Sequence, residues 1–197
     1  MRAAGAQSLM FFTLPTLLTW ARILAIPLVV GVFYVPIQPV TANLLATVIF
    51  IVVALTDWAD GYLARKLNQT SAFGAFLDPV ADKFLVCAAL LVLVQLERVD
   101  AFIALVIIGR EIAISALREW MAQIGASRSV AVHMLGKLKT TVQLIAVPML
   151  LFDGRLFGVI DTAWWGTVLI VVAAILTIWS MVYYLRKALP EIRARVR

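Results

Sequence analysis

The sequence is poor in cysteine, in histidine and in charge. Its one cysteine, Cys87, excludes an intramolecular disulfide, and its one histidine, His133, makes a poor case for a zinc site. Charged residues make up only 14% of the 197 residues. A soluble domain of this length needs far more polar surface, because its exterior faces water. These shortages exclude a disulfide-stabilised scaffold and an ordinary soluble domain.

Hydrophobic residues, in contrast, make up 63% of the chain, and the mean hydropathy is +1.00. A run of about 20 apolar residues is long enough to cross a bilayer core of about 30 Å. About six such runs are present. We therefore expect an all-α, polytopic membrane protein with about six transmembrane helices. The expected spans lie near residues 16–35, 43–64, 75–96, 100–122, 137–152 and 162–185.

The basic residues predict how the chain is oriented. With a cytoplasmic N-terminus, fifteen of the 17 lysines and arginines fall at or near the cytoplasmic side, against Arg98 and Arg155 on the other. The positive-inside rule then places both termini of this multi-pass membrane protein in the cytoplasm. The net charge of +6 is explained by this topology and by attraction to anionic lipids, so no nucleic-acid partner is needed.

The N-terminal segment through Phe12 has no small-residue cleavage site after its apolar stretch, so we do not interpret it as a cleaved signal peptide. We expect an amphipathic helix there, lying along the membrane interface. No internal repeat, low-complexity tract or domain boundary is visible. The sequence therefore predicts a single domain over residues 1–197.

Four carboxylates interrupt two neighbouring apolar segments. On helices, the first pair falls three residues apart and the second pair four apart, so each pair shares one face. The connection around residues 68–71 is short and polar, which predicts antiparallel helices with the carboxylates near their cytoplasmic end. The pattern reads Asp57-x-x-Asp60-Gly61-x-x-Ala64-Arg65, eight residues, then Gly74-x-x-x-Asp78-x-x-x-Asp82.

Four negative charges so close together need cations. Two like charges 4 Å apart cost about 4 kcal/mol at an effective dielectric near 20. Carboxylate oxygens select magnesium, manganese or calcium over zinc, and paired metal ions commonly assist displacements at phosphorus. Gly61 and Gly74 would let a phosphate or nucleotide approach the helix backbone. The simpler alternative is a set of interhelical salt bridges to Arg65, Lys66 and Lys83 without any metal.

The complete aspartate pattern resembles the signature of the CDP-alcohol phosphotransferases, which are integral membrane enzymes that join a CDP-linked group to an alcohol and release CMP. The resemblance implies two divalent ions, Mg²⁺ or Mn²⁺, held by the first three aspartates. It implies that Asp82 lies beside the ions as the base, where it can also touch a metal. The positions that it implies for the CDP pocket are Gly61, Ala64, Arg65, Ser71 and Gly74.

The acceptor alcohol must be inferred from the rest of the chain. Residues 110–112, 117–120 and 136–143, together with 15–22, closely resemble the bacterial phosphatidylglycerophosphate synthases. The resemblance implies CDP-diacylglycerol and glycerol 3-phosphate as substrates, membrane lipid as surroundings and a homodimer. Four basic residues at the cytoplasmic ends of the fourth and fifth spans suit a doubly charged phosphate. They are Arg110, Arg118, Lys137 and Lys139.

Other interpretations of the basic residues and of the aspartates remain open. The basic residues could be ordinary flanks under the positive-inside rule, although Arg110 and Glu111 interrupt an apolar helix. Arg118 follows Arg110 two turns later, on roughly the same helix face. Glu111 could serve to orient a neighbouring arginine. The same chemistry could act on another acceptor, such as inositol phosphate. A cation transporter, which is a different class, could also place four aspartates on facing helices.

Overall fold

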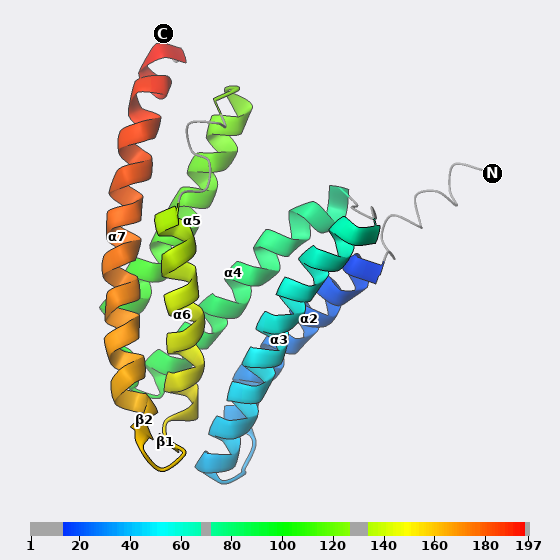
Figure 1. The fold of residues 1–197 in the computed structure, drawn as a ribbon, viewed down its shortest axis with the longest axis vertical. Helices are drawn as coiled ribbons and strands as arrows, with labels where there is room; N and C mark the ends of the chain where they lie inside the picture. The colour runs from blue at the N-terminus through cyan, green and yellow to red at the C-terminus, as the bar shows by residue number, and fades with distance from the viewer. Residues whose placement is uncertain (1–13, 68–71, 127–133, 196–197) are drawn as a thin grey trace, which may run out of the picture. The chain divides into compact units, whose positions relative to one another are not determined.

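In the computed structural model, residues 14–67, 72–126 and 134–195 are described. This part of the chain is almost entirely helical, as the composition predicts (Figure 1). It divides into two compact units, one formed by Met1–Val92 with Leu151–Asp153 and the other by Leu93–Leu150 with Gly154–Arg197. The single domain expected for the chain stays a prediction.

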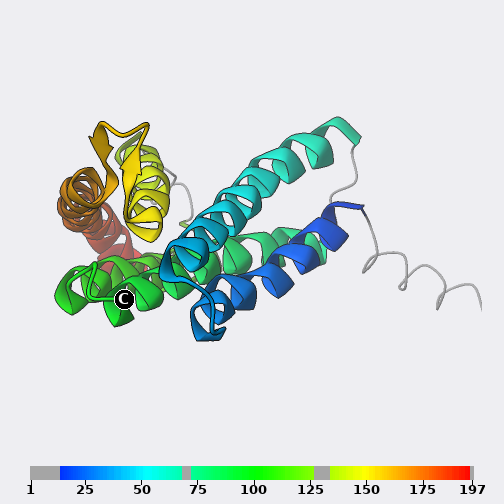
Figure 2. The same cartoon turned by 90° about the horizontal axis from the view of Figure 1, so that it is seen from below.

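The first unit is built from three long helices and one short 3-10 helix. Helix α2 packs against α3, and α4 then runs back in the general direction opposite to α3 (Figure 1). Figure 2 shows the same three helices from below. Pro27 lies inside α2 without ending it. The elements are α2 (Leu14–Gly31), η1 (Val32–Tyr34), α3 (Pro39–Leu67) and α4 (Ala72–Gln95).

Apolar side chains, most of them small or branched, form the core of the first unit. They recur three or four residues apart on α3 and on α4, so each helix has one buried stripe. Thr47 and Thr56 are accommodated because their hydroxyls donate to the carbonyls of Asn43 and Val53, each at 2.7 Å. The stripe residues are Ala42, Ala46, Phe50 and Val53 on α3, and Ala81, Leu85 and Ala89 on α4.

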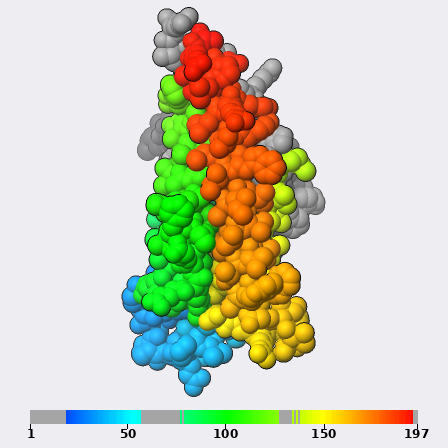
Figure 3. Space-filling view, turned by 90° about the vertical axis from the view of Figure 1, so that its left-hand side faces the viewer, coloured from blue at the N-terminus to red at the C-terminus, as the bar shows by residue number. Residues whose placement is uncertain are grey.

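The second unit contains three helices and a small antiparallel hairpin. Helix α5 packs along α7, and Figure 3 shows the two lying against each other, α5 in green and α7 in orange. Pro148 lies inside α6 without ending it. The elements are α5 (Ala101–Gln123), α6 (Met134–Phe152), β1 (Arg155–Leu156), β2 (Ile160–Asp161) and α7 (Thr162–Arg195).

Local hydrogen bonds define both ends of α5. At its start, the Asp100 carboxylate accepts from the backbone N–H of Phe102 at 2.8 Å. At its end, Gly125 adopts a φ of 73°, and the N–H of Ala126 donates to the carbonyl of Met121 at 2.7 Å. This geometry is a Schellman motif, in which glycine takes the left-handed position without a side-chain clash. The helix therefore has a defined length and presents a fixed face to α7.

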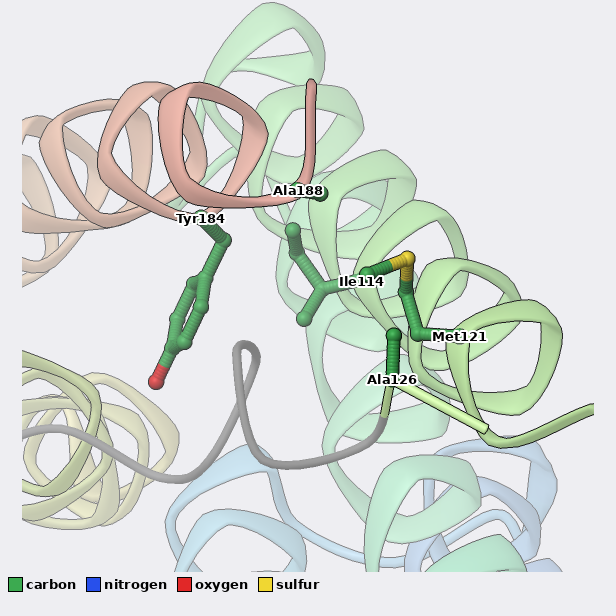
Figure 4. Packing of buried hydrophobic residues seen from close by; sticks show 5 residues of the cluster. All are labelled: Ile114, Met121, Ala126, Tyr184 and Ala188. Carbon is green, nitrogen blue, oxygen red and sulfur yellow. The ribbon is translucent and has the colours of Figure 1, made fainter. Parts of the chain in front are cut away.

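A buried cluster joins α5 to α7 (Figure 4). Ile114 and Met121 lie seven residues apart on α5, and Tyr184 and Ala188 lie four apart on α7, so each pair shares one helix face. Ala126, just after α5, completes the cluster. The Tyr184 hydroxyl points away from Met121 in Figure 4. The cluster thus holds the tyrosine ring and leaves its polar end to other partners.

All six predicted apolar segments are helices, which confirms the all-α class and the helix count for the described residues. Two helices are long and apolar enough to cross a membrane, over Pro39–Thr56 and Thr162–Ala194, and two shorter apolar stretches accompany them. Large apolar side chains are exposed on both long helices; Val40 is 77% exposed and Trp179 60%. Such surfaces suit lipid rather than water. The predicted interfacial helix through Phe12 lies outside the described residues.

Close packing of α6 against α7 generates a stability prediction. A Cβ at Gly166 would lie 2.7 Å from the Leu150 Cγ and 3.2 Å from the Leu150 backbone nitrogen, which cannot move independently. Gly166→Ala should therefore lower the free energy of unfolding by about 1–3 kcal/mol. Gly109→Ala is the matched control, because a Cβ at Gly109 meets no described atom within 4 Å.

Thermal unfolding of the two alanine variants in the same detergent checks this prediction. Helix propensity favours alanine over glycine by about 1 kcal/mol, so Gly109→Ala should be neutral or stabilising. A Gly166→Ala protein as stable as Gly109→Ala would contradict the close approach of α6 and α7.

Candidate active site

The predicted carboxylates lie on two successive helices of the first unit. Asp57 and Asp60 are on α3, Asp78 and Asp82 are on α4, and both helices run without interruption through these positions. Asp82 is half-buried. The side chains of the other three aspartates lie outside the described part of the structure. The helical spacing that the sequence predicts is therefore present in the backbone, and the convergence of the four carboxylates stays a prediction.

The predicted nucleotide-binding positions lie near the same connection. Gly61, Ala64 and Arg65 occupy the last turns of α3, and Gly74 occupies the first turn of α4. Their side-chain surroundings lie outside the described part of the structure, as does Ser71 altogether. Helix α3 ends at Leu67 and α4 begins at Ala72, five positions later. The two halves of the aspartate pattern are therefore joined by a short stretch of chain.

The donor chemistry of these helices fits hard divalent cations. Carboxylate oxygens are the ligands that magnesium and manganese prefer, and both halves of the pattern present them at helical spacing. Among the described side chains, no group of three or more histidines, cysteines or carboxylates forms a metal site elsewhere. The four aspartates of α3 and α4 stay the predicted ligands because of their pattern and donor chemistry.

The second unit contains a buried cationic cluster around Arg110 of α5. The Arg110 side chain is only 5% exposed. Its Nη2 donates to the Ser180 hydroxyl of α7 at 3.0 Å, and its Nη1 lies 3.4 Å from the Glu111 carboxylate. Its guanidinium carbon lies 5.7 Å from the centre of the Tyr184 ring. Arg110 is thus held by polar and aromatic groups inside an apolar helix pair.

Arg118, two turns further along α5, contacts the same tyrosine. Its Nη2 donates to the Tyr184 hydroxyl at 3.4 Å, and its guanidinium carbon lies 5.2 Å from the ring centre. Tyr184 itself is 1% exposed. The sequence-based prediction that Arg110 and Arg118 share one helix face is confirmed, because both reach one side chain of α7.

Lys139 of α6 joins the cluster through Glu111. The two side chains form an ion pair, and both are largely buried. Glu111 contacts Arg110 as well, so this carboxylate bridges cations from two helices. The hypothesis that Glu111 orients a neighbouring arginine is consistent with this contact. Lys137 also lies on α6, and its side chain is outside the described part of the structure.

The described cluster has more positive than negative charge. Arg110, Arg118 and Lys139 are cations, and Glu111 is the carboxylate that the structure pairs with two of them. In addition, Nε of Arg110 and Nε of Arg118 are buried and have no hydrogen-bond partner among the described residues. A buried donor without a partner costs about 1–3 kcal/mol. The cluster is therefore suited to an anion such as a phosphate.

Comparison with known proteins identifies the family. The model of the CDP-alcohol phosphatidyltransferase family matches residues 12–189 of the chain. The chain belongs to this family. The match covers both halves of the aspartate pattern and the buried cationic cluster, which confirms the resemblance inferred from the sequence.

Several bacterial members of this CDP-alcohol phosphatidyltransferase family are similar to the chain over most of its length. It is 49% identical over 182 residues to the CDP-diacylglycerol–glycerol-3-phosphate 3-phosphatidyltransferase of Escherichia coli K12, covering 91% of this chain and 96% of the relative. The enzyme of the same name from Haemophilus influenzae is 47% identical over 181 residues, 91% and 95% of the two chains. That from Salmonella typhimurium is 48% identical over 182 residues, 91% and 96%.

Sequence reasoning did not identify Ser180 and Tyr184 as the α7 residues that contact Arg110 and Arg118 in this CDP-alcohol phosphatidyltransferase. A signal was present, because Thr177, Ser180 and Tyr184 recur three and four residues apart in an otherwise apolar helix. All three are fully or almost fully buried on one face of α7. Gly136 of α6 lies close to this face of α7, because a Cβ at Gly136 would be 3.2 Å from the Tyr184 hydroxyl.

The Glu111 bridge predicts a stability effect. Removing one partner of a buried ion pair costs about 3–5 kcal/mol, because the other charge stays buried. Glu111→Gln should therefore destabilise the protein by about 3 kcal/mol, the lower end, since Glu111 is partly accessible. Glu119→Gln, on the exposed side of α5, should change stability by less than about 0.5 kcal/mol.

The free energy of unfolding of these two variants is compared in mixed micelles, with unfolding followed by near-ultraviolet circular dichroism. Adding Lys139→Met to Glu111→Gln should recover part of the loss, because both members of the pair are then neutral. Equal stability of Glu111→Gln and Glu119→Gln, or no recovery in the double variant, would reject the bridge.

Proposed function

We propose that the protein transfers the phosphatidyl group of CDP-diacylglycerol to the primary hydroxyl of glycerol 3-phosphate, giving phosphatidylglycerol phosphate and CMP. The observation that carries this proposal is the similarity to enzymes of that name, 49% identity across 91% of the chain for the Escherichia coli enzyme. The complete aspartate pattern on α3 and α4 supports the phosphoryl chemistry. The buried cationic cluster of α5, α6 and α7 supports a phosphate-bearing acceptor.

The proposed reaction is a displacement at phosphorus. The acceptor hydroxyl oxygen forms a bond to the phosphorus next to diacylglycerol, and the bond from that phosphorus to CMP breaks. The electron pair of the broken bond leaves with CMP, and Asp82 takes the hydroxyl proton. A carboxylate is a weak base at neutral pH, so the positioning of the hydroxyl beside Asp82 must provide most of the acceleration.

The aspartates provide the proposed metal site. Asp57, Asp60 and Asp78 would hold two divalent ions, Mg²⁺ or Mn²⁺, with Asp82 beside them and able to touch one. When bound, such ions supply Lewis-acid compensation for negative charge on the pyrophosphate. Cations also relieve the mutual repulsion of four carboxylates in an apolar setting.

The proposed nucleotide pocket lies on the same two helices. Arg65 would pair with a phosphate of the CDP group, because a guanidinium matches phosphate geometry with two parallel hydrogen bonds. Ser71 would add a hydroxyl. Gly61, Ala64 and Gly74 have no side chain or a small one, so they would let the nucleotide approach the helix backbone.

The proposed acceptor pocket is the cationic cluster. Arg110 and Arg118 would make the direct contacts to the phosphate of glycerol 3-phosphate, because each has a buried Nε without a partner among the described residues. Lys137 and Lys139 would add positive charge. The ion pair between Lys139 and Glu111 leaves the arginines as the main source of surplus charge.

The proposed setting is the bacterial cytoplasmic membrane. Six helices would cross the bilayer with both termini and the site on the cytoplasmic side, and the segment through Phe12 would lie along the interface. The acyl chains of CDP-diacylglycerol would stay in the lipid while the headgroup reaches the site. A homodimer, which the family resemblance implies, completes the proposal.

The overall reaction can be tested with purified protein in mixed micelles. CMP release should require CDP-diacylglycerol, glycerol 3-phosphate and Mg²⁺ or Mn²⁺ together, and a chelator should stop it reversibly. Ion uptake into vesicles without CMP release would indicate a cation transporter instead. Faster CMP release with inositol phosphate than with glycerol 3-phosphate would reject the proposed acceptor.

The roles of the aspartates predict different losses. Asp78→Ala should abolish turnover by weakening metal binding, whereas Asp82→Asn should lower kcat by about 10²–10⁴-fold with folding and metal affinity retained. Asp153→Asn is the matched carboxylate-to-amide control and should be fully active, because asparagine tolerates its φ of 46°. An Asp82→Asn protein with the wild-type kcat would show that another group accepts the proton.

A further inference from the structure

We propose that Tyr184 of α7 is a positioning residue that holds the guanidinium groups of Arg110 and Arg118 where they receive the acceptor's phosphate monoester. The inference rests on the proposed function and adds a residue that the sequence pattern did not include. It is carried by the contacts that Tyr184 makes with two arginines of a different helix.

The two arginines approach the same aromatic ring. Their guanidinium carbons lie 5.7 and 5.2 Å from the Tyr184 ring centre, within the range at which a cation is attracted by the ring's negative face. Two like charges that approach one side chain also repel each other. The ring therefore compensates part of the repulsion that would otherwise drive Arg110 and Arg118 apart when no anion is bound.

Separate hydrogen bonds fix the two guanidinium groups. Nη2 of Arg118 donates to the Tyr184 hydroxyl, and Nη2 of Arg110 donates to the Ser180 hydroxyl one turn earlier on α7. In both arginines these bonds leave Nε without a partner among the described residues. Each guanidinium is thus oriented while retaining donors for a ligand, which is the arrangement that two-point phosphate recognition needs.

The tyrosine itself has little freedom to move. Its ring belongs to the cluster that includes Ile114, Met121 and Ala188, and its side chain is 1% exposed. In Figure 4 the ring reaches from α7 with its hydroxyl directed away from Met121. The hydroxyl approaches Gly136 of α6 so closely that a Cβ there would lie 3.2 Å away. The apolar packing therefore determines where the polar end of Tyr184 lies.

An ordinary structural role for Tyr184 makes a different prediction. A core tyrosine can be replaced by phenylalanine at some cost in stability, and substrate affinity then stays unchanged. A positioning residue instead changes the Michaelis constant for the substrate whose binding groups it orients. The two roles are therefore separated by kinetics with each substrate, measured on folded protein.

The test compares Tyr184→Phe, which removes the hydroxyl, with Tyr184→Leu, which also removes the aromatic face. Tyr183→Phe is the matched control, because it removes an adjacent hydroxyl and keeps the ring, whose centre lies 4.9 Å from the Lys187 Nζ and 5.7 Å from the centre of the Tyr184 ring. The KM for glycerol 3-phosphate should rise about 3–10-fold for Tyr184→Phe and about 30–100-fold for Tyr184→Leu. The KM for CDP-diacylglycerol should stay at the wild-type value in all three, and kcat should change by less than about 3-fold.

Calorimetric titration with glycerol 3-phosphate in the absence of CDP-diacylglycerol gives the same comparison without turnover. Wild-type KM values and affinities for glycerol 3-phosphate in a folded Tyr184→Phe protein would overturn the inference and leave the proposed function intact. If Tyr184→Leu does not fold, the KM and affinity of Tyr184→Phe for glycerol 3-phosphate are sufficient to test the inference. Wild-type protein that releases no CMP would instead contradict the proposed function, and the inference with it.

Discussion

Charge placed inside apolar helices must be compensated, and this constraint governs both units of the protein. The low dielectric of such surroundings makes an isolated charge costly, so ionisable residues there occur with partners. In the second unit the partners are visible: Glu111 bridges Arg110 and Lys139, and Tyr184 contacts two arginines. In the first unit, four aspartates on α3 and α4 set the same requirement with the opposite sign, and the divalent cations that we propose there would meet it.

The charges of the cationic cluster are only partly neutralised by the described neighbouring groups, and this surplus charge suits the cluster to bind a ligand. The cationic cluster retains surplus positive charge and buried donors without partners among the described residues, so an anion stabilises it further. The four carboxylates, if they converge as we predict, would have surplus negative charge and would attract cations. The proposed transfer of a phosphatidyl group to glycerol 3-phosphate would use both kinds of site, because one substrate contains a pyrophosphate and the other a phosphate monoester. The family shared with the bacterial enzymes is consistent with this division.

Much of this architecture was predictable from sequence, because helix position depends on local hydropathy. The six expected spans correspond to α2–α7. Helix α7, however, continues to Arg195, ten residues past the predicted end at residue 185. Hydropathy did not predict this extension, because the last turns of the helix are charged rather than apolar. The aspartate pattern was recognisable because its spacing is local to two helices. The contact of Tyr184 with Arg118 was not, since these residues are 66 positions apart in the sequence. The Glu111–Lys139 pair likewise depends on how α5 and α6 pack, which hydropathy does not report.

Counting bound metal ions tests the central claim most directly, because the proposed chemistry depends on cations held by the carboxylates of α3 and α4. The measurement is isothermal titration of Mn²⁺ into the metal-free wild-type protein and into Asp57→Ala, with anomalous scattering from crystals grown at saturating Mn²⁺. We expect two ions per chain in the wild type, bound between α3 and α4, and fewer in Asp57→Ala. No bound Mn²⁺ in the wild-type protein by either method would contradict the account.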